Sequence, residues 1–84
     1  MSYQLIWLPK SKKALKKLDK QTIERITSHM EIIKISPYKY VERVKSKDYY
    51  KTRVGNYRIF VDVKTNENSL EVLTIRHRRN AYKD

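Results

Sequence analysis

The chain has 84 residues, of which 39% are hydrophobic and 35% are charged, and its formal net charge is +11. This length allows one hydrophobic core, so we expect one domain spanning residues 1–84. The chain has no cysteine, which excludes disulfides and thiolate metal sites, and no apolar run approaches the ~20 residues of a membrane span.

The excess of basic residues predicts an anionic partner. With 20 Lys and Arg against 9 Asp and Glu, the surface should attract nucleic acid, an acidic protein or an anionic membrane. The N-terminal segment MSYQLIWLPK lacks the basic region and long apolar stretch of a signal peptide, so we expect a cytoplasmic protein.

The first half of the chain predicts one strand and two helices. Residues 2–8 have the pattern of a strand, and Pro9 suits the first turn of a helix over residues 10–19. A second helix is expected over residues 21–35, since four apolar residues recur at spacings of three and four: Ile23, Ile26, Met30 and Ile33. His29 lies in this helix without a ligand partner four residues on, which favours a structural role.

Six lysines lie along the first helix and just before the second: Lys10, Lys12, Lys13, Lys16, Lys17 and Lys20. They form either a solvated helix face or a surface that contacts phosphates. The apolar stripe between them is too thin for a helix that lies on a membrane.

The second half predicts three strands after an irregular or partly extended connection at residues 38–47. Strands at 48–54 and 57–64 flank the turn Gly55-Asn56, and a polar turn at 65–69 leads to a last strand at 70–76. The order β-α-α-β-β-β predicts an α+β fold: an antiparallel sheet with a helical hairpin packed on one face.

The face opposite the helices should be cationic. Pairing about Gly55-Asn56 places Arg53 opposite Arg58, and like charges ~5 Å apart across strands are destabilising. An anionic ligand accounts for this pair better than stability does. Lys51 and Asp62 should share this face, above a floor of Phe60, Leu73 and Ile75.

The last strand should bring further basic residues to the same end of the sheet. Pairing about Asn66-Glu67 places Arg58 level with Ile75, so His77 and Arg78 would emerge just beyond the cationic face.

These side chains suit a phosphate group. Arginine binds phosphate oxygens through a planar fork, and a lysine crowded by arginines is disfavoured in its charged form, which suits a general base. Tyr49, Tyr57 and Tyr82 could stack on a base. No metal-binding motif is present, and the 2′-hydroxyl of RNA supplies its own nucleophile, so no metal or cofactor is expected. On charge and spacing alone, a passive binding surface is favoured over catalysis.

Two segments resemble the RelE family of the RelE/ParE toxin superfamily, the ribosome-associated mRNA interferases of toxin–antitoxin pairs. They are YKTRVGNYR at residues 50–58 and IRHRRNAY at residues 75–82. One departure is Arg76, which stands where the family usually has glycine.

The resemblance implies a role for each matching residue. Lys51 would be the general base, with Arg53 at the second basic position of that strand, and Arg58 would stabilise the scissile phosphate. Arg78 would also hold phosphate, and Tyr82 would stack on an mRNA base. His77 is a candidate acid–base group.

The resemblance further implies that mRNA is cut in the ribosomal A site by metal-independent attack of a 2′-hydroxyl. The six lysines would bind ribosomal RNA, and an acidic RelB-like antitoxin would neutralise the cationic face; operator DNA would be bound only by the toxin–antitoxin complex. Two alternatives stay open: a ParE-like inhibitor of DNA gyrase without nuclease activity, and an inactive basic module that binds an antitoxin and DNA.

Overall fold

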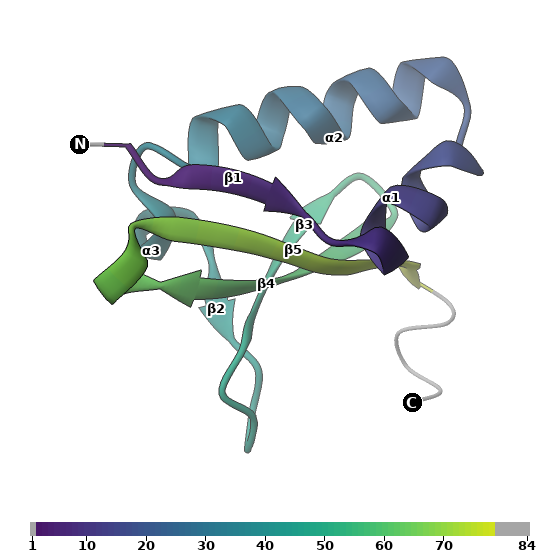
Figure 1. Cartoon of the computed structure of the whole chain (residues 1–84). Helices are drawn as coiled ribbons and strands as arrows, with labels where there is room; N and C mark the ends of the chain where they lie inside the picture. The colour runs from purple at the N-terminus through teal and green to yellow at the C-terminus, as the bar shows by residue number, and fades with distance from the viewer. Residues whose placement is uncertain (1, 79–84) are drawn as a thin grey trace.

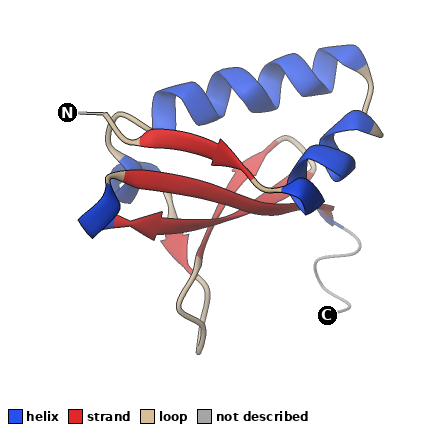
Figure 2. Ribbon diagram, in the orientation of Figure 1, coloured by secondary structure: helices blue, strands red, loops and turns tan. Residues whose placement is uncertain are grey.

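The computed structural model describes residues 2–78 and shows one sheet with helices against it (Figure 1). The elements, in chain order, are β1 (Gln4–Trp7), α1 (Pro9–Lys16), α2 (Lys20–Ile33), α3 (Pro37–Tyr40), β2 (Glu42–Arg43), β3 (Tyr50–Val54), β4 (Tyr57–Lys64), the 3-10 turn η1 (Thr65–Glu67) and β5 (Ser69–His77). The expected α+β class is therefore confirmed (Figure 2). Among the described residues, no helix is long and apolar enough to cross a membrane.

The sheet is mixed, which corrects the expectation of an antiparallel sheet. Its order is β1-β5-β4-β3-β2, and β1 runs parallel to β5, with Leu5 opposite Leu70, while the other neighbours are antiparallel. An alternating apolar pattern identifies a strand but not its direction, because side chains alternate equally in both arrangements. The direction of β1 therefore could not be read from its residues.

The connection at residues 38–47, expected to be irregular or partly extended, contains two short elements. Pro37 opens α3, where its fixed φ suits a first helical position. The two residues of β2 then pair with β3, and Glu42 lies opposite Lys51. The sheet thus gains a fifth strand, which places a carboxylate beside the expected cationic face.

The two longer helices begin at residues suited to their positions. Pro9 starts α1, and the hydroxyl of Ser11 donates a hydrogen bond of 2.7 Å to the Leu8 carbonyl. Asp19 caps α2, since its carboxylate accepts the Thr22 amide hydrogen at 3.2 Å. The helices begin and end within three residues of the predicted limits.

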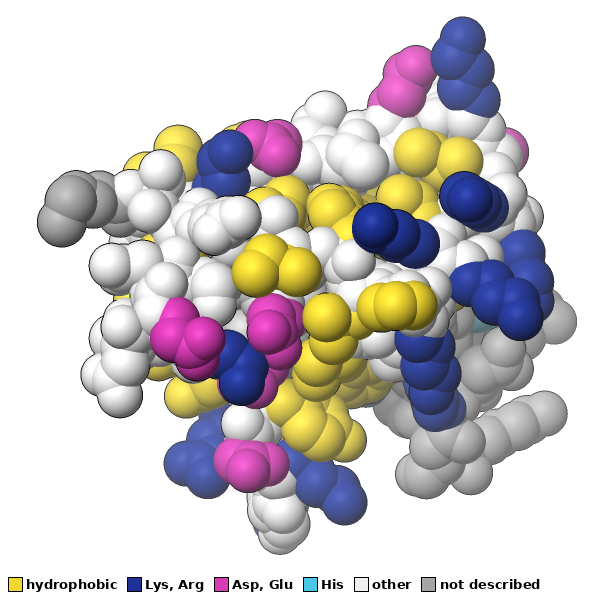
Figure 3. All heavy atoms as spheres, in the orientation of Figure 1, with side chains coloured by type: hydrophobic (Ala, Val, Ile, Leu, Met, Phe, Trp, Pro, Cys, Tyr) yellow, Lys and Arg dark blue, Asp and Glu magenta, His cyan; other side chains and the backbone are white. Residues whose placement is uncertain are grey.

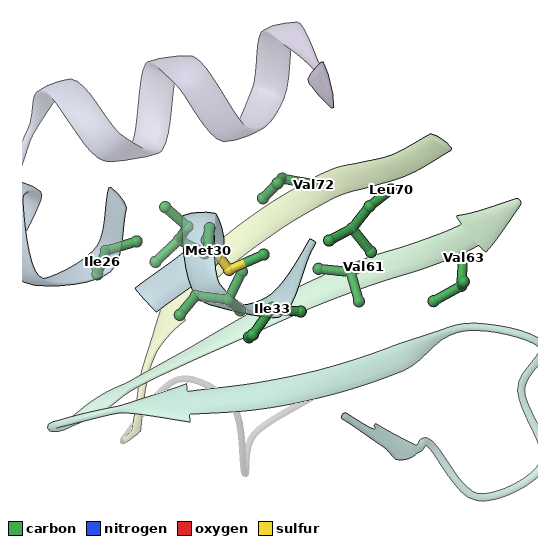
Figure 4. Packing of buried hydrophobic residues seen from close by; sticks show 9 residues of the cluster. Ile26, Met30, Ile33, Val61, Val63, Leu70 and Val72 are labelled. Atoms are coloured by element: carbon green, nitrogen blue, oxygen red, sulfur yellow. The ribbon is translucent and has the colours of Figure 1, made fainter. Parts of the chain in front are cut away.

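The core lies between α2 and one face of the sheet (Figure 4). Ile26, Met30 and Ile33 of the predicted stripe are fully buried, and they meet the buried aliphatic residues of β4 and β5: Ile59, Val61, Val63, Leu70, Val72 and Ile75. Each such side chain contributes ~1.5–3 kcal/mol when fully buried. The core thus lies on the face of the sheet that meets α2, and the other face does not contribute to it.

A β-bulge changes the register between β4 and β5. Val61 lies opposite Val72, but Phe60 lies opposite Thr74, so one extra residue of β5 is accommodated at this point. Arg58 consequently lies opposite Arg76, not Ile75 as a continuous register predicts. Ile75 lies opposite Ile59 and is 7% exposed, so it belongs to the core and not to the floor of the cationic face.

His29 has a structural position, as its sequence context favours. Its Nε2 is 3.0 Å from the Thr52 hydroxyl of β3, and burial lowers the pKa of its imidazole from the ordinary value of 6.5.

The His29 pKa predicts a pH dependence of stability. The unfolded chain binds more protons at this residue than the folded chain does, so the free energy of unfolding should fall as the pH drops below 6.5 toward the lower folded pKa. Urea unfolding between about pH 7.5 and about pH 5.5 should show this decline. In His29→Gln the decline should be smaller; an equal decline would mean that other groups cause it.

Candidate nucleic-acid interface

Three arginines form a row across the face of the sheet that does not meet α2. Arg53 of β3 lies opposite Arg58 of β4, and Arg58 lies opposite Arg76 of β5. The turn at Gly55, with φ of 58°, sets the first pairing, and the bulge sets the second. Residues directly opposite each other point to the same face, so the three guanidinium groups belong to one surface.

This row has an electrostatic cost. Like charges that lie directly opposite across a strand pair destabilise a sheet, and here the arrangement occurs twice in succession. An anion bound between the guanidinium groups would offset the repulsion. Because arginine stays charged and presents paired donors, phosphate is the anion that the row suits best.

A small hollow of about 210 Å³ lies beside the row. We call it the basic hollow; its lining residues are Tyr40, Glu42, Lys51, Thr52, Arg53 and Arg58. Three of the lining side chains are cationic, and Glu42 is the acid among them. The sheet therefore brings together three of the residues predicted from the sequence: Lys51, Arg53 and Arg58.

A larger groove of about 500 Å³ also opens on this face of the sheet, and we call it the aromatic groove. Its floor contains Tyr49, Phe60 and Leu73, and Val44 and Thr74 also line it. Its basic residues are Lys10, Lys45, Lys47 and Arg76. Figure 3 shows one face of the molecule, where hydrophobic side chains gather near the centre and basic side chains lie mainly to the right of them and below them, with acidic side chains in between.

His77 does not join the arginine row. It lies opposite Tyr57, with the two rings 5.2 Å apart at 89°, and Tyr57 packs against the core. A residue that pairs with a core-facing residue shares its face, so His77 lies on the opposite side of the sheet from Arg58. The reason is the bulge, which shifts the last part of β5 by one residue and exchanges its faces.

The other C-terminal candidates lie at or beyond the limit of the described chain. Arg78 directly follows β5 and is exposed, and its amide donates a hydrogen bond of 2.6 Å to the Asn56 carbonyl. This bond ties the end of β5 to the β3–β4 turn, so Arg78 is held near that end of the sheet. Tyr82 lies outside the described residues.

The predicted lysine surface is exposed along α1 and just after it. All six side chains are solvent-accessible: Lys10, Lys12, Lys13, Lys16, Lys17 and Lys20. One of them, Lys10, also lines the aromatic groove, so the helix and the sheet contribute cations to one surface.

Several residues of this face were not anticipated from the sequence. Tyr40 and Glu42 line the basic hollow, while Lys45 and Lys47 reach the aromatic groove from the connection between β2 and β3. The pair of lysines just before Tyr49 was the available signal, but its position depends on β2, which the sequence did not reveal. Within residues 2–78, no group of three or more His, Asp and Glu side chains is placed to hold a metal ion.

Comparison with known proteins places this fold among the RelE toxins. The toxin–antitoxin complex RelBE2 from Mycobacterium tuberculosis contains a chain that is 16% identical, with a TM-score of 0.84, and the match covers 93% of this chain and 100% of that one. For the archaeal RelE–RelB complex from Pyrococcus horikoshii the identity is 25%, the TM-score 0.81 and the coverage 93% and 97%. The YoeB/ParE toxin from Agrobacterium tumefaciens is 22% identical, with a TM-score of 0.74 and coverage of 88% and 96%.

The sequence also matches a family model. Residues 5–82 fit the model of the ParE toxin of the type II toxin–antitoxin system parDE. The chain therefore belongs to this toxin family, within the RelE/ParE superfamily. No curated protein sequence matches it significantly.

Proposed function

We propose that this toxin is a ribosome-dependent endoribonuclease that cuts mRNA in the ribosomal A site and thereby inhibits translation. The observation that carries the proposal is the row of Arg53, Arg58 and Arg76 with Lys51 beside it in the basic hollow. Attraction of an acidic protein requires only a basic surface, and it does not require arginines that lie directly opposite one another across strands, an arrangement that is destabilising.

The chemistry is an in-line displacement at phosphorus. The 2′-oxygen attacks the adjacent phosphorus and gives its proton to a base; the bond to the 5′-oxygen breaks, and that oxygen gains a proton as it leaves. In this proposal Lys51 of the basic hollow takes the first proton, and Arg58, at the centre of the row, stabilises the charge that develops on the phosphate oxygens. The attacking group belongs to the RNA, so the reaction requires no metal.

The remaining basic residues have supporting roles in this proposal. Arg53 and Arg78 hold phosphates, Tyr82 stacks on a base, and the exposed lysines of α1 bind ribosomal RNA. His77 has no acid–base role in this mechanism, because it lies on the other side of the sheet from Arg58.

An acidic antitoxin is the expected protein partner. The matched chains from M. tuberculosis and P. horikoshii come from toxin–antitoxin complexes, and a net charge of +11 favours an acidic ligand. We propose a RelB-like antitoxin that covers the cationic face, and operator DNA that is bound only through the complex.

A second candidate function is inhibition of DNA gyrase. The observation in its favour is that the matching family model is that of the ParE toxins. Inhibition of gyrase does not require Lys51, Arg53 and Arg58 to line one hollow with Arg76 opposite Arg58, so this arrangement favours the ribonuclease.

Expression of the chain without an antitoxin distinguishes the two functions. We expect new mRNA 5′ ends within codons of translated genes, mapped by sequencing, and none when translation initiation is blocked beforehand. Purified chain should leave the supercoiling activity of gyrase unchanged. DNA damage and gyrase inhibition with intact mRNA would instead establish the second function.

A further inference from the structure

We propose that the aromatic groove is a binding subsite for one unstacked nucleobase of single-stranded RNA, next to the phosphate held by the arginine row. The inference rests on the proposed ribonuclease function, because it adds a base-binding position to the same face of the sheet.

The floor of the groove offers an aromatic surface outside the core. The rings of Tyr49 and Phe60 are 6.0 Å apart at 84°, and both side chains are only partly buried. Leu73 extends this apolar floor onto β5. An apolar surface with a polar rim is typical of a binding site, and aromatic side chains stack on every base because each base has a π-face.

The linings of the two hollows, together with their volumes, indicate which part of a nucleotide each suits. The aromatic groove, at about 500 Å³, is within the range of small-molecule sites, whereas the basic hollow has about 210 Å³. The larger, apolar-floored groove suits a base. The smaller one, lined by Lys51, Arg53 and Arg58, suits a phosphate.

Charge favours nucleic acid as the occupant. Lys10, Lys45, Lys47 and Arg76 line the groove, and among the described residues that line it none is acidic. These four cations come from α1, the β2–β3 connection and β5, so they surround the floor from three parts of the chain. Aromatic rings within a basic groove are the combination by which proteins bind single strands.

The spacing along the sheet connects the groove to the arginine row. Phe60 is two residues from Arg58 on the same face of β4, a distance of ~7 Å that one nucleotide can span. Arg76 belongs to both, because it lines the groove and lies opposite Arg58. The bulge produces this arrangement, since it aligns Arg76 with Arg58 and adds the extra residue beside Phe60.

The test uses a short single-stranded RNA that carries one 2-aminopurine and 2′-O-methyl groups, so that it is not cleaved. Binding to the wild-type chain should quench the 2-aminopurine emission by stacking. Tyr49→Leu and Phe60→Leu should each abolish the quenching and weaken binding about 5- to 150-fold, which corresponds to the loss of one base–aromatic stack. Tyr38→Leu is the matched control, since Tyr38 is 52% exposed on α3 and lies outside the groove.

Salt dependence separates stacking from ionic contacts. In Lys45→Ala/Lys47→Ala the slope of log K against log salt should become shallower by ~0.7 for each phosphate that the variant no longer neutralises. In Phe60→Leu the slope should be unchanged. Circular dichroism and melting curves confirm that each variant is folded.

Unchanged affinity and quenching in folded Tyr49→Leu and Phe60→Leu would overturn the subsite. The subsite would also be overturned if these variants lost binding of an acidic peptide but still bound RNA, because the groove would then bind a protein partner. Cleavage of translated mRNA by the wild-type chain is measured separately. If the wild type cleaves mRNA and the variants bind RNA as tightly as the wild type does, only the base subsite is rejected. Groove-dependent quenching without any cleavage would reject the ribonuclease function and retain the base site.

Discussion

Replacement of Arg58 by alanine is expected to lower the rate of mRNA cleavage by about 10²- to 10³-fold and to leave the fold intact. Arg58 lies at the centre of the arginine row, between Arg53 and Arg76, so it has another arginine on each side. Its side chain belongs to the face away from the core, so its removal leaves the packing against α2 unchanged. Single-turnover cleavage of ribosome-bound mRNA, followed by primer extension, measures the effect.

Two variants serve as controls for Arg58→Ala. Arg58→Lys keeps the charge but not the planar fork, so its rate should lie between those of the alanine variant and the wild type. Arg25→Ala removes the same charge from the exposed surface of α2, outside the basic hollow, and should cleave at the wild-type rate. A folded Arg58→Ala protein that cuts at the wild-type rate would remove the basis of the proposed mechanism.

The β3–β4 hairpin was predictable in detail, because local chemistry determines it. Gly55 adopts the positive φ that the first central residue of a two-residue turn requires, and the turn then determines the register of the hairpin. The structure confirms the predicted pairs, from Val54 opposite Tyr57 to Lys51 opposite Phe60. The helix stripe was equally readable, since spacings of three and four residues predicted burial of Ile26, Met30 and Ile33.

The register of β5 could not be predicted, because it depends on a bulge. One extra residue beside Phe60 exchanges the two faces of the strand end. It moves Ile75 into the core and His77 against Tyr57, and it brings Arg76 into the row. Arg76 was known from the sequence only as a departure from the glycine of the RelE family. The structure places it where it adds a third arginine to the site.

The aromatic groove was hidden for a related reason. Phe60 and Leu73 were expected on the cationic face, but the groove also needs lysines from the β2–β3 connection and from α1. These residues are far apart in sequence, and no local pattern indicates that Lys10, Lys47 and Phe60 approach one another. Sequence periodicity therefore identified the face, and tertiary structure determined which residues share a groove.

Replacement of Lys51 by alanine is the second prediction with a large expected effect, a loss of about 10²- to 10⁴-fold in cleavage rate. Lys51 lines the basic hollow together with Arg53 and Arg58, two arginines of the row. Single-turnover cleavage of ribosome-bound mRNA by the folded variant measures the loss.

Lys51→Arg separates proton transfer from charge. Arginine keeps the positive charge at this position but cannot give up its proton, so as a general base it should fail as completely as alanine does. If Lys51 only stabilises the phosphate, Lys51→Arg should instead cleave at nearly the wild-type rate. That outcome would assign Lys51 to the same electrostatic role as Arg58 and move the proton acceptor to another group. Equal losses of cleavage rate in Lys51→Ala and Lys51→Arg would support the role of Lys51 as the proton acceptor.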